Sequence, residues 1–185
     1  MLAVQRKGPV RRRPSILTLT CLPLALAPAA VGELARRVEP LGYNGVKMGM
    51  TVAQASAVFG PLRIDPNSTP DDTGSCTYAF PVGRRSPAFM VIDGRIERVD
   101  VSTRAIPSRN GILVGDPAAR VFARFGRSNV AVSKHKYDPR GTYIEVKPVL
   151  PAERGHRLLF ETSRGRVTQF RAGRIPAVWF VEGCA

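Results

Sequence analysis

One stretch of this chain occurs twice, and this repetition is the strongest constraint on how the chain folds. Residues 44–60 (NGVKMGMTVAQASAVFG) align without a gap with residues 110–126 (NGILVGDPAARVFARFG). Seven of the 17 aligned positions are identical. Because an internal repeat marks one supersecondary unit used twice, we expect two related units, over residues 44–109 and 110–185.

Each copy has the pattern of a short amphipathic helix that ends at a glycine. In the first copy Thr51 is a good N-cap, and Gln54 completes a capping box. In the second copy Asp116 and Pro117 open the helix instead, as an acidic cap with proline in the first turn. We therefore predict one short helix in each unit.

Strand patterns follow each predicted helix. They cover residues 77–80, 88–92 and 96–101 in the first unit and 142–144, 156–162 and 167–171 in the second, which also has an extra strand over 130–136. The segment 61–75 between helix and strands is a polar connection, and the tail 177–185 could add a last strand. The predicted fold class is α+β, with two tandem units of one helix and three antiparallel strands. Such small units bury too little area alone, so they must share or merge one sheet.

The N-terminal residues have the composition of an export signal. Five basic residues lie among the first 14, and an uncharged Leu- and Ala-rich run follows over residues 15–32. Ala27-Pro28-Ala29 fits the small-x-small rule for cleavage. We predict a signal peptide over 1–29, a linker over 30–43 and a periplasmic or secreted protein. An uncleaved membrane anchor and a lipid anchor at Cys21 are the alternatives.

Export would leave two cysteines, Cys76 and Cys184, in an oxidising compartment. We predict that they form a disulfide between the first unit and the end of the chain. Two unpaired thiols would be the better interpretation if the protein stayed in the cytosol. Since the chain has only two histidines, His135 and His156, we predict no metal site and no cofactor.

The charge of the chain favours acidic partners. Removal of a leader with five basic residues and no acid lowers the net charge from +14 to +9. Such a field attracts an acidic protein surface or an acidic envelope component such as lipopolysaccharide phosphates, with nucleic acid the less favoured choice. The alternative is a solvated surface whose charge only maintains solubility. The sequence defines no oligomeric state.

The helix entry Gly49-Met50-Thr51, with Ala55 and the closing Phe59-Gly60, resembles a known module. The pattern G-M-T-x-x-x-V-x-x-x-[LF]-G is similar to that of outer-membrane assembly lipoproteins of the SmpA/OmlA type. Two copies in an exported chain resemble the tandem-repeat β-lactamase inhibitory proteins. This resemblance implies helices on one side of an antiparallel sheet whose concave face binds another protein. The matched residues are caps, core residues and a stop glycine, so no binding residue carries over.

The sequence has no catalytic signature: it lacks a nucleophile elbow, an H-E-x-x-H helix and a phosphate-binding loop. The acidic pair Asp71-Asp72 lies in a loop rich in Pro, Ser, Thr and Gly, where we expect it to be solvated. A hydrolase with a non-standard site would need His135 or His156 beside an orienting carboxylate. No such carboxylate can be identified in the sequence.

Basic and aromatic residues of the second unit are the best candidates for binding a partner. They are Lys134, Lys136, Tyr137, Tyr143, Arg171, Arg174 and Trp179. Interface hot spots favour Trp, Tyr and Arg, and alternate residues of neighbouring strands converge on one face. The alternative is that Tyr143 and Trp179 are core residues.

The sequence therefore favours an exported, non-catalytic protein that binds another protein through a concave sheet, of the inhibitor or envelope-assembly type. A basic, polyanion-binding envelope protein and a hydrolase with a non-standard site are the alternatives. Binding that falls steeply with added salt would favour the polyanion binder.

Overall fold

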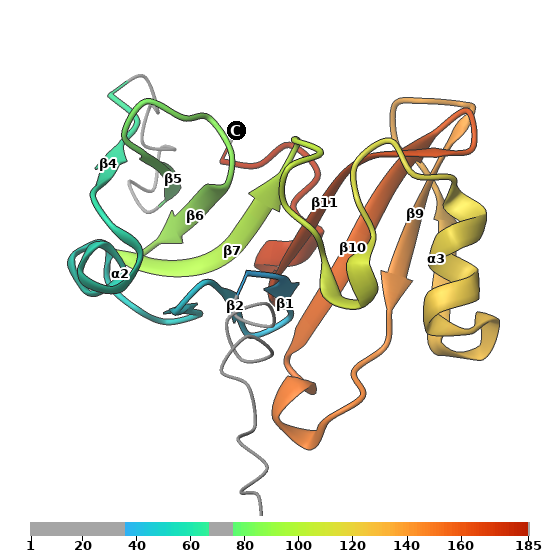
Figure 1. Ribbon diagram of the computed structural model, residues 1–185, viewed down its shortest axis with the longest axis horizontal. Helices are drawn as coiled ribbons and strands as arrows, with labels where there is room; N and C mark the ends of the chain where they lie inside the picture. The colour runs from blue at the N-terminus through green and yellow to red at the C-terminus, as the bar shows by residue number, and fades with distance from the viewer. Residues whose placement is uncertain (1–35, 67–75, 185) are drawn as a thin grey trace, which may run out of the picture.

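A computed structural model describes residues 36–66 and 76–184, and its main element is one eight-stranded antiparallel sheet (Figure 1). The order of its strands is β4-β5-β6-β7-β11-β10-β9-β8. They are β4 (Leu62–Ile64), β5 (Cys76–Pro81), β6 (Ala88–Ile92), β7 (Arg95–Val101), β8 (Val130–Lys134), β9 (Gly141–Val146), β10 (His156–Ser163) and β11 (Arg166–Arg174). A second, small sheet contains β1 (Val38–Glu39), β2 (Gly42–Tyr43) and β3 (Val46–Lys47). The predicted α+β class is confirmed in this sheet-rich form.

Two short α-helices lie at opposite ends of the large sheet, α2 (Val52–Phe59) and α3 (Ala118–Phe125) (Figure 1). The capping box predicted for the first helix is confirmed. Thr51 Oγ1 accepts the N–H of Gln54 at 3.2 Å, and Gln54 Oε1 accepts the N–H of Thr51 at 2.9 Å. Short 3-10 helices complete the described elements: η1 (Arg109–Gly111), η2 (Arg127–Asn129), η3 (Pro151–Glu153) and η4 (Ala177–Trp179).

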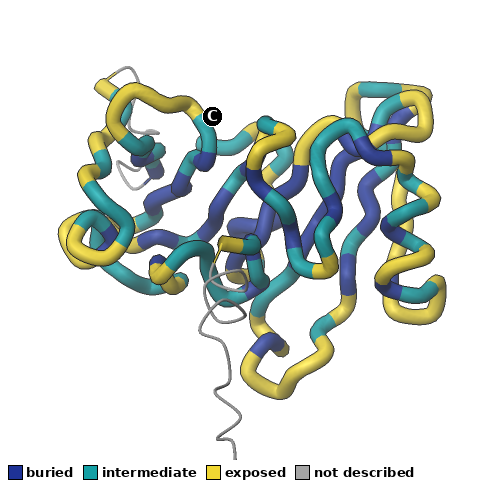
Figure 2. The backbone as a smooth tube through the Cα atoms, viewed as in Figure 1, coloured by how far each residue is buried: buried dark blue, intermediate teal, exposed yellow. Residues whose placement is uncertain are grey.

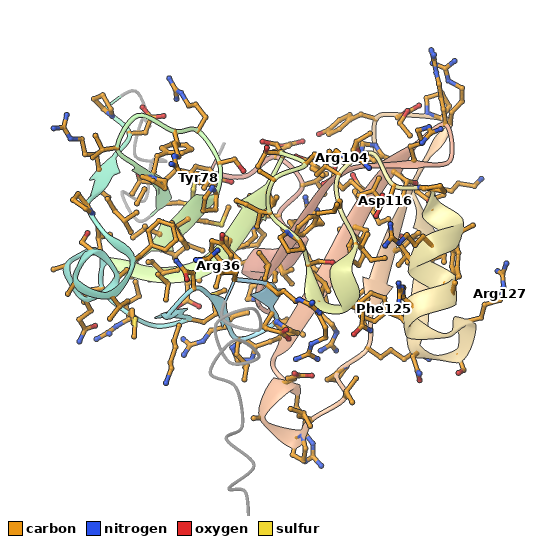
Figure 3. The ribbon with its side chains drawn as sticks, in the orientation of Figure 1. Arg36, Tyr78, Arg104, Asp116, Phe125 and Arg127 are labelled. Carbon is orange, nitrogen blue, oxygen red and sulfur yellow. A yellow bond between two sulfur atoms is a disulfide. The ribbon has the colours of Figure 1, made fainter. Side chains whose placement is uncertain are left out.

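The second helix begins differently from the prediction. Its N-cap is Pro117, which makes no side-chain capping bond. The buried carboxylate of Asp116, predicted as the cap, instead accepts the N–H of Leu113 at 2.9 Å and binds Arg120. Arg104 lies 3.8 Å from the same carboxylate (Figure 3). Asp116 therefore fixes the turn that precedes the helix, because its oxygens are directed at a loop N–H and two arginines.

The middle of the sheet is the pairing of β7 with β11. Each of these strands is the last of four consecutive strands, so the pairing joins two consecutive halves of the chain. Gly173 lies opposite Arg98 in this pair, and a Cβ atom at Gly173 would come within 2.3 Å of the backbone oxygen of Glu97. The join between the halves therefore requires glycine at this position.

Corresponding backbone hydrogen bonds attach the helix entry of each half to its last strand. The N–H of Gly49 donates to the carbonyl of Ile96 at 2.7 Å, and the N–H of Gly115 donates to that of Val167 at 2.7 Å. Both donors belong to the repeated segment found in the sequence. Each helix is thus positioned by the strand that also joins the two halves.

One face of the sheet packs against the helices and forms the main core. Its large, fully buried side chains include Phe89, Val99, Ile144, Leu158, Phe160 and Phe170. Figure 2 shows that buried residues run along the central strands, while the outer loops are mostly exposed and each helix is only partly buried. Because strand residues alternate between faces, the neighbours of these core residues lie on the other face.

Three expectations need correction. Each half has four strands, because β4 falls within the segment predicted as a polar connection. This strand has only three residues, too few to produce an alternating pattern. Val38, in the predicted linker, is fully buried and bridges to Ser108. The tail forms the single turn η4 in place of a strand.

Several expectations lie outside the described residues. These are the signal peptide over 1–29, the possible anchors, and the pair Asp71-Asp72. Among the residues that the structure describes, no helix has both the length and the apolar character needed to cross a bilayer.

A buried carboxylate ties together three segments that are distant in sequence. The side chain of Glu153 is fully buried and accepts the N–H groups of Val149 at 3.0 Å and Leu150 at 3.2 Å. It also binds Arg109, which in turn binds Glu39 of β1. Burial raises the pKa of Glu153, but the hydrogen bonds from Arg109 and the two N–H groups outweigh it, so the net pKa is lowered.

We expect Glu153→Gln to lower the free energy of unfolding by about 3 kcal/mol, because it removes the buried one of the two carboxylates that pair with Arg109. Urea unfolding at pH 7 measures this change. The Glu153 contribution is present above its usual pKa of 4.5 and is lost as the pH falls through the lowered value. The exposed Glu182→Gln is the control and should change stability by less than about 0.5 kcal/mol. Equal stability of the two variants would contradict the assignment.

Candidate functional site

The sheet face turned away from the helices carries charged and polar side chains. They come from five strands: Tyr78, Arg98, Asp100, Tyr143, Glu145, Glu161, Gln169 and Arg171. Each strand places these residues next to core residues of the other face. The C-terminal segment, residues 175–184, packs onto these side chains, so we name this side of the sheet the tail face.

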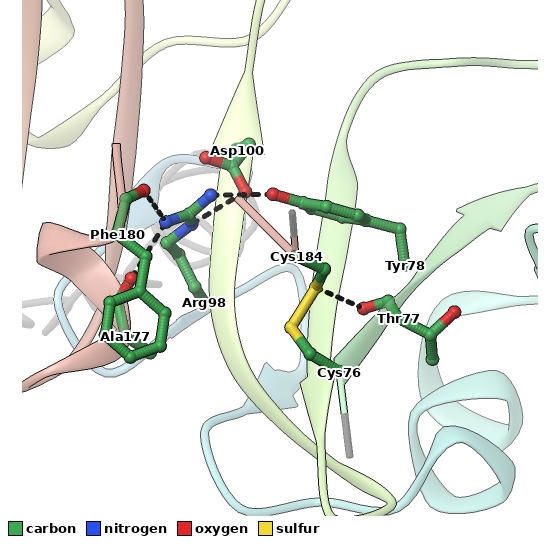
Figure 4. Close-up of a disulfide and its surroundings, with 8 residues drawn as sticks. All are labelled: Cys76, Thr77, Tyr78, Arg98, Asp100, Ala177, Phe180 and Cys184. Carbon is green, nitrogen blue, oxygen red and sulfur yellow. Dashed lines mark hydrogen bonds and ion pairs between the residues drawn. A yellow bond between two sulfur atoms is a disulfide. The ribbon is translucent and has the colours of Figure 1, made fainter. Parts of the chain in front are cut away.

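Two buried arginines of the central strand pair hold the tail through its backbone. Arg98 is 2% exposed, and its Nη1 donates to the carbonyls of Ala177 at 2.8 Å and Phe180 at 2.7 Å. Arg171 is 4% exposed, and its Nε donates to the carbonyl of Val178 at 2.7 Å. Guanidinium groups suit this task because they present several donors in a rigid plane. Figure 4 shows Arg98 between the tail and the strands.

Acidic partners neutralise both arginines. Arg98 Nε donates to Asp100 at 2.9 Å, and Arg171 Nη1 donates to the buried carboxylate of Glu161. Burial raises the pKa of Asp100, and the charge of Arg98 opposes this effect. Arg98 Nη2 also donates to the hydroxyl of Tyr78 at 2.7 Å. Burial, with a smaller contribution from Asp100, raises the pKa of Tyr78 to about 12.

A disulfide between Cys76 and Cys184 attaches the end of the tail to β5 (Figure 4). The predicted pairing is confirmed; the two Cα atoms are 5.3 Å apart and the residues are separated by 108 positions. At the other end of the tail, Val178 is fully buried against Tyr143 and Leu159. The tail is therefore held by a covalent bond, an apolar contact and the two arginines.

The tail and the adjacent β8–β9 loop present exposed aromatic residues. Trp179 is 44% exposed, Phe180 39% and Tyr137 60%. Trp179 Nε1 donates to Glu145 at 2.7 Å, which orients the indole. Lys136 Nζ donates to Glu182 at 2.8 Å, and the hydroxyl of Tyr137 binds the same carboxylate. We name the set of Lys136, Tyr137, Trp179, Phe180 and Glu182 the tail surface.

Five of the seven predicted binding residues lie at or beneath this surface. Lys136, Tyr137 and Trp179 form part of it, and Tyr143 and Arg171 are buried below the tail. The alternative that Tyr143 is a core residue is therefore correct. For Trp179 it is wrong, because the tail turns the indole to solvent.

The other two predicted residues lie elsewhere. Lys134 is exposed and pairs with Thr142, whose side chain points away from the tail face because its neighbour Tyr143 points toward it. Arg174 binds Glu97 at 3.1 Å on the helix side of the sheet. The sequence could not separate these two from the rest because strand bounds and register were unknown.

The structure supplies a carboxylate for His135 that sequence reasoning missed. His135 Nε2 lies 3.3 Å from Glu161 Oε2. Nδ1 accepts the backbone N–H groups of Tyr137 at 3.1 Å and Asp138 at 3.0 Å. The ring also stacks on Tyr143, with 4.5 Å between centroids. Both nitrogens are occupied by structural hydrogen bonds, so this geometry positions the β8–β9 loop and presents no free base.

His156 is not positioned as a catalytic base either. Its Nδ1 is buried with no hydrogen-bond partner among the described residues. Burial lowers the pKa of its imidazole, the charge of Arg174 lowers it further, and Glu153 opposes them. His156 therefore favours the neutral form without an orienting carboxylate.

A pocket of about 290 Å³ lies between the tail and the central strands. Its charged and polar lining includes Tyr78, Arg98, Asp100, Gln169, Arg171 and Glu182. This volume is at the low end for small-molecule sites, and both signs of charge line it. We therefore take the exposed tail surface, and not this pocket, as the candidate binding site of this face.

No protein-family model matches the chain, and no curated protein matches it. One similar solved structure is an extracellular protein containing a SCP domain from Bacillus anthracis str. Ames, with 12% identity and a TM-score of 0.44. The match covers 69% of this chain but only 44% of that one. Another is the uncharacterized protein yfeY from Escherichia coli, with 15% identity, a TM-score of 0.43 and coverage of 76% and 97%.

We expect Cys184→Ser to destabilise the protein by about 4 kcal/mol, because the disulfide closes a loop of about a hundred residues. Unfolding in urea measures this loss. Trp179 fluorescence, the signal of the only tryptophan in the chain, should also shift to longer wavelength as the tail loosens. The Cys76→Ser variant should behave in the same way. Unchanged stability in both would show that the bond contributes little.

We expect Tyr78 to ionise near pH 12, above the usual tyrosine pKa of 10. Alkaline titration followed by ultraviolet absorbance measures this ionisation. Because folding raises this pKa from 10, the Tyr78 contribution to stability is present below pH 10 and is lost toward pH 12. Tyr78→Phe should remove the ionisation step near pH 12, whereas Tyr137→Phe should leave that step in place. A step near pH 12 that persists in Tyr78→Phe would refute the assigned environment.

Proposed function

We propose that this protein is an exported, non-catalytic protein that binds another protein through the tail surface. The observation that carries this proposal is the fixed presentation of Trp179, Phe180 and Tyr137 above a buried ionic network. Large aromatics with a polar handle dominate protein interfaces. The disulfide and the buried arginines order these side chains before binding, so little conformational entropy remains to be lost.

The charge of the protein supports an acidic protein as the partner. The chain carries a net charge of +14, or +9 without the predicted signal peptide, although on the tail surface itself Lys136 is paired with Glu182. Such a field accelerates encounter with an acidic surface and favours the correct orientation. Buried aromatic contacts would then supply the affinity that resists added salt.

Export is supported by two independent features. The first residues have the order of a signal peptide: basic, apolar and then small. The Cys76–Cys184 disulfide suits an oxidising compartment such as the periplasm or the medium. We therefore place the working protein outside the cytosol, with a membrane anchor as the alternative.

We also infer that the two halves are copies of one helix-and-sheet unit that share the large sheet. The repeated segment supports this inference, as do corresponding contacts in the two halves. Arg95 Nη1 donates to the carbonyl of Gly49 at 2.9 Å, and Arg166 Nη1 donates to that of Gly115 at 3.0 Å. The motif resemblance adds the inhibitor or envelope-assembly type of function to this proposal.

A polyanion-binding envelope protein is the second candidate, because arginines are abundant in both halves. The two candidates differ in how binding depends on salt. Each phosphate contact releases a counterion, so binding to a polyanion falls steeply as salt rises. Binding through the aromatic residues would persist.

We expect the Trp179→Ala, Tyr137→Ser double variant to lose at least tenfold in affinity for a partner captured from periplasmic extract. Capture by the full chain at low and high salt, followed by titration of the purified partner, measures the change. Lys134→Ala is the matched control, since Lys134 is exposed but lies off the tail surface. Equal losses in the variant and the control, or capture only of polyanions, would overturn the proposal.

A further inference from the structure

The β9–β10 loop, residues 147–155, carries an uncharged apolar tip that projects from the body of the molecule (Figures 1 and 2). Residues 148–152 read Pro-Val-Leu-Pro-Ala. Val149 is 67% exposed and Leu150 53%, and Pro151 and Ala152 are exposed beside them. Consecutive exposed aliphatic residues at a loop tip differ from the isolated apolar residues normal on a surface.

Most backbone N–H groups of this tip have a hydrogen-bond partner within the loop. Its two prolines have no N–H group, and the N–H groups of Val149 and Leu150 donate to Glu153 Oε2 at 3.0 and 3.2 Å. Glu153 donates its own N–H to the carbonyl of Leu150 at 2.9 Å. Transfer into an apolar medium is costly mainly for unpaired backbone groups. This loop has already paired most of its donors internally.

The exposed charged residues of the loop itself are both basic. Lys147 and Arg154 flank the apolar residues and are exposed, while the only acid of the loop, Glu153, is fully buried and turned inward against Arg109. An apolar tip within a basic collar matches the boundary between acyl chains and anionic headgroups.

Trp179 lies at the base of the same loop. Arg157 Nη1 donates to the carbonyl of Arg154 at 3.0 Å, and Arg157 Nε donates to Glu145 Oε1 at 2.9 Å. The other oxygen of Glu145 accepts Trp179 Nε1 at 2.7 Å. Two side chains therefore connect the end of the loop to a partly exposed indole. Tryptophan is favoured at the interface between lipid and water.

We propose that the β9–β10 loop inserts its Val149-Leu150 tip into the surface of an anionic lipid bilayer, with Lys147 and Arg154 at the headgroups. Because the tip projects from the molecule, it can enter a fluid bilayer surface without a groove of matching shape. This inference goes beyond the proposed function and does not depend on it.

The sole tryptophan gives a direct test with the full chain. Vesicles of phosphatidylcholine with phosphatidylglycerol, carrying brominated acyl chains, should quench Trp179 fluorescence, and pure phosphatidylcholine vesicles should quench it much less. Val149→Ser with Leu150→Ser should reduce the quenching at least fivefold. Lys147→Gln with Arg154→Gln should increase the vesicle concentration needed for half-maximal quenching at least threefold.

The matched control is Val58→Ser with Val82→Ser, two valines that are 53% and 52% exposed elsewhere on the surface. It should be quenched like the parent. An N-terminal anchor would bring every variant to the vesicles equally, so co-sedimentation alone is not the criterion. Equal quenching of the loop variant and the control, or no quenching of the parent, would overturn the proposal. Loss of protein capture in the loop variant without any lipid response would also overturn it.

Discussion

Both the apolar core and the position of the tail depend on the pairing of β7 with β11. On one face its residues complete the apolar core beneath the helices, with Val99 and Phe170 buried. On the other face it places Arg98 and Arg171 where both reach the backbone of the tail. The close approach at Gly173 makes this pairing possible. A change in register by one residue would exchange the two faces and lose both the core and the tail site.

The buried charges of the tail face are balanced in pairs along this junction. Arg98 pairs with Asp100 on its own strand, and Arg171 pairs with Glu161 on the neighbouring strand β10. Buried ion pairs contribute little net stability, but loss of one partner is costly. In this protein the ion pairs orient the two arginines, so that their other N–H groups donate to carbonyls of the tail. The order of the tail surface, and with it the proposed protein binding, depends on this arrangement.

The β9–β10 loop is held in place by buried contacts, although its tip does not contribute to the core. Glu153 is neutralised by Arg109 and is connected through it to Glu39 of the small sheet. The same carboxylate pairs the backbone of an exposed apolar tip. Val149 and Leu150 remain in solvent because no described element covers them. The β9–β10 loop and the tail surface are connected through Glu145, which accepts hydrogen bonds from Arg157 and Trp179.

Local features were predictable from the sequence because they depend on neighbours in the chain. The capping box of Thr51 and Gln54, the two short helices and most strands of the sheet are of this kind. The Cys76–Cys184 disulfide was predictable because Cys76 and Cys184 are the only two cysteines outside the predicted signal peptide. The role of Glu161 had a weak signal in the sequence, because this acid directly follows the apolar run Leu158-Leu159-Phe160. Only the tertiary structure decided that Trp179 is exposed, that Arg174 lies on the other face and that His135 meets Glu161. These outcomes depend on register, strand order and the path of the tail, which arise from contacts between residues far apart in sequence.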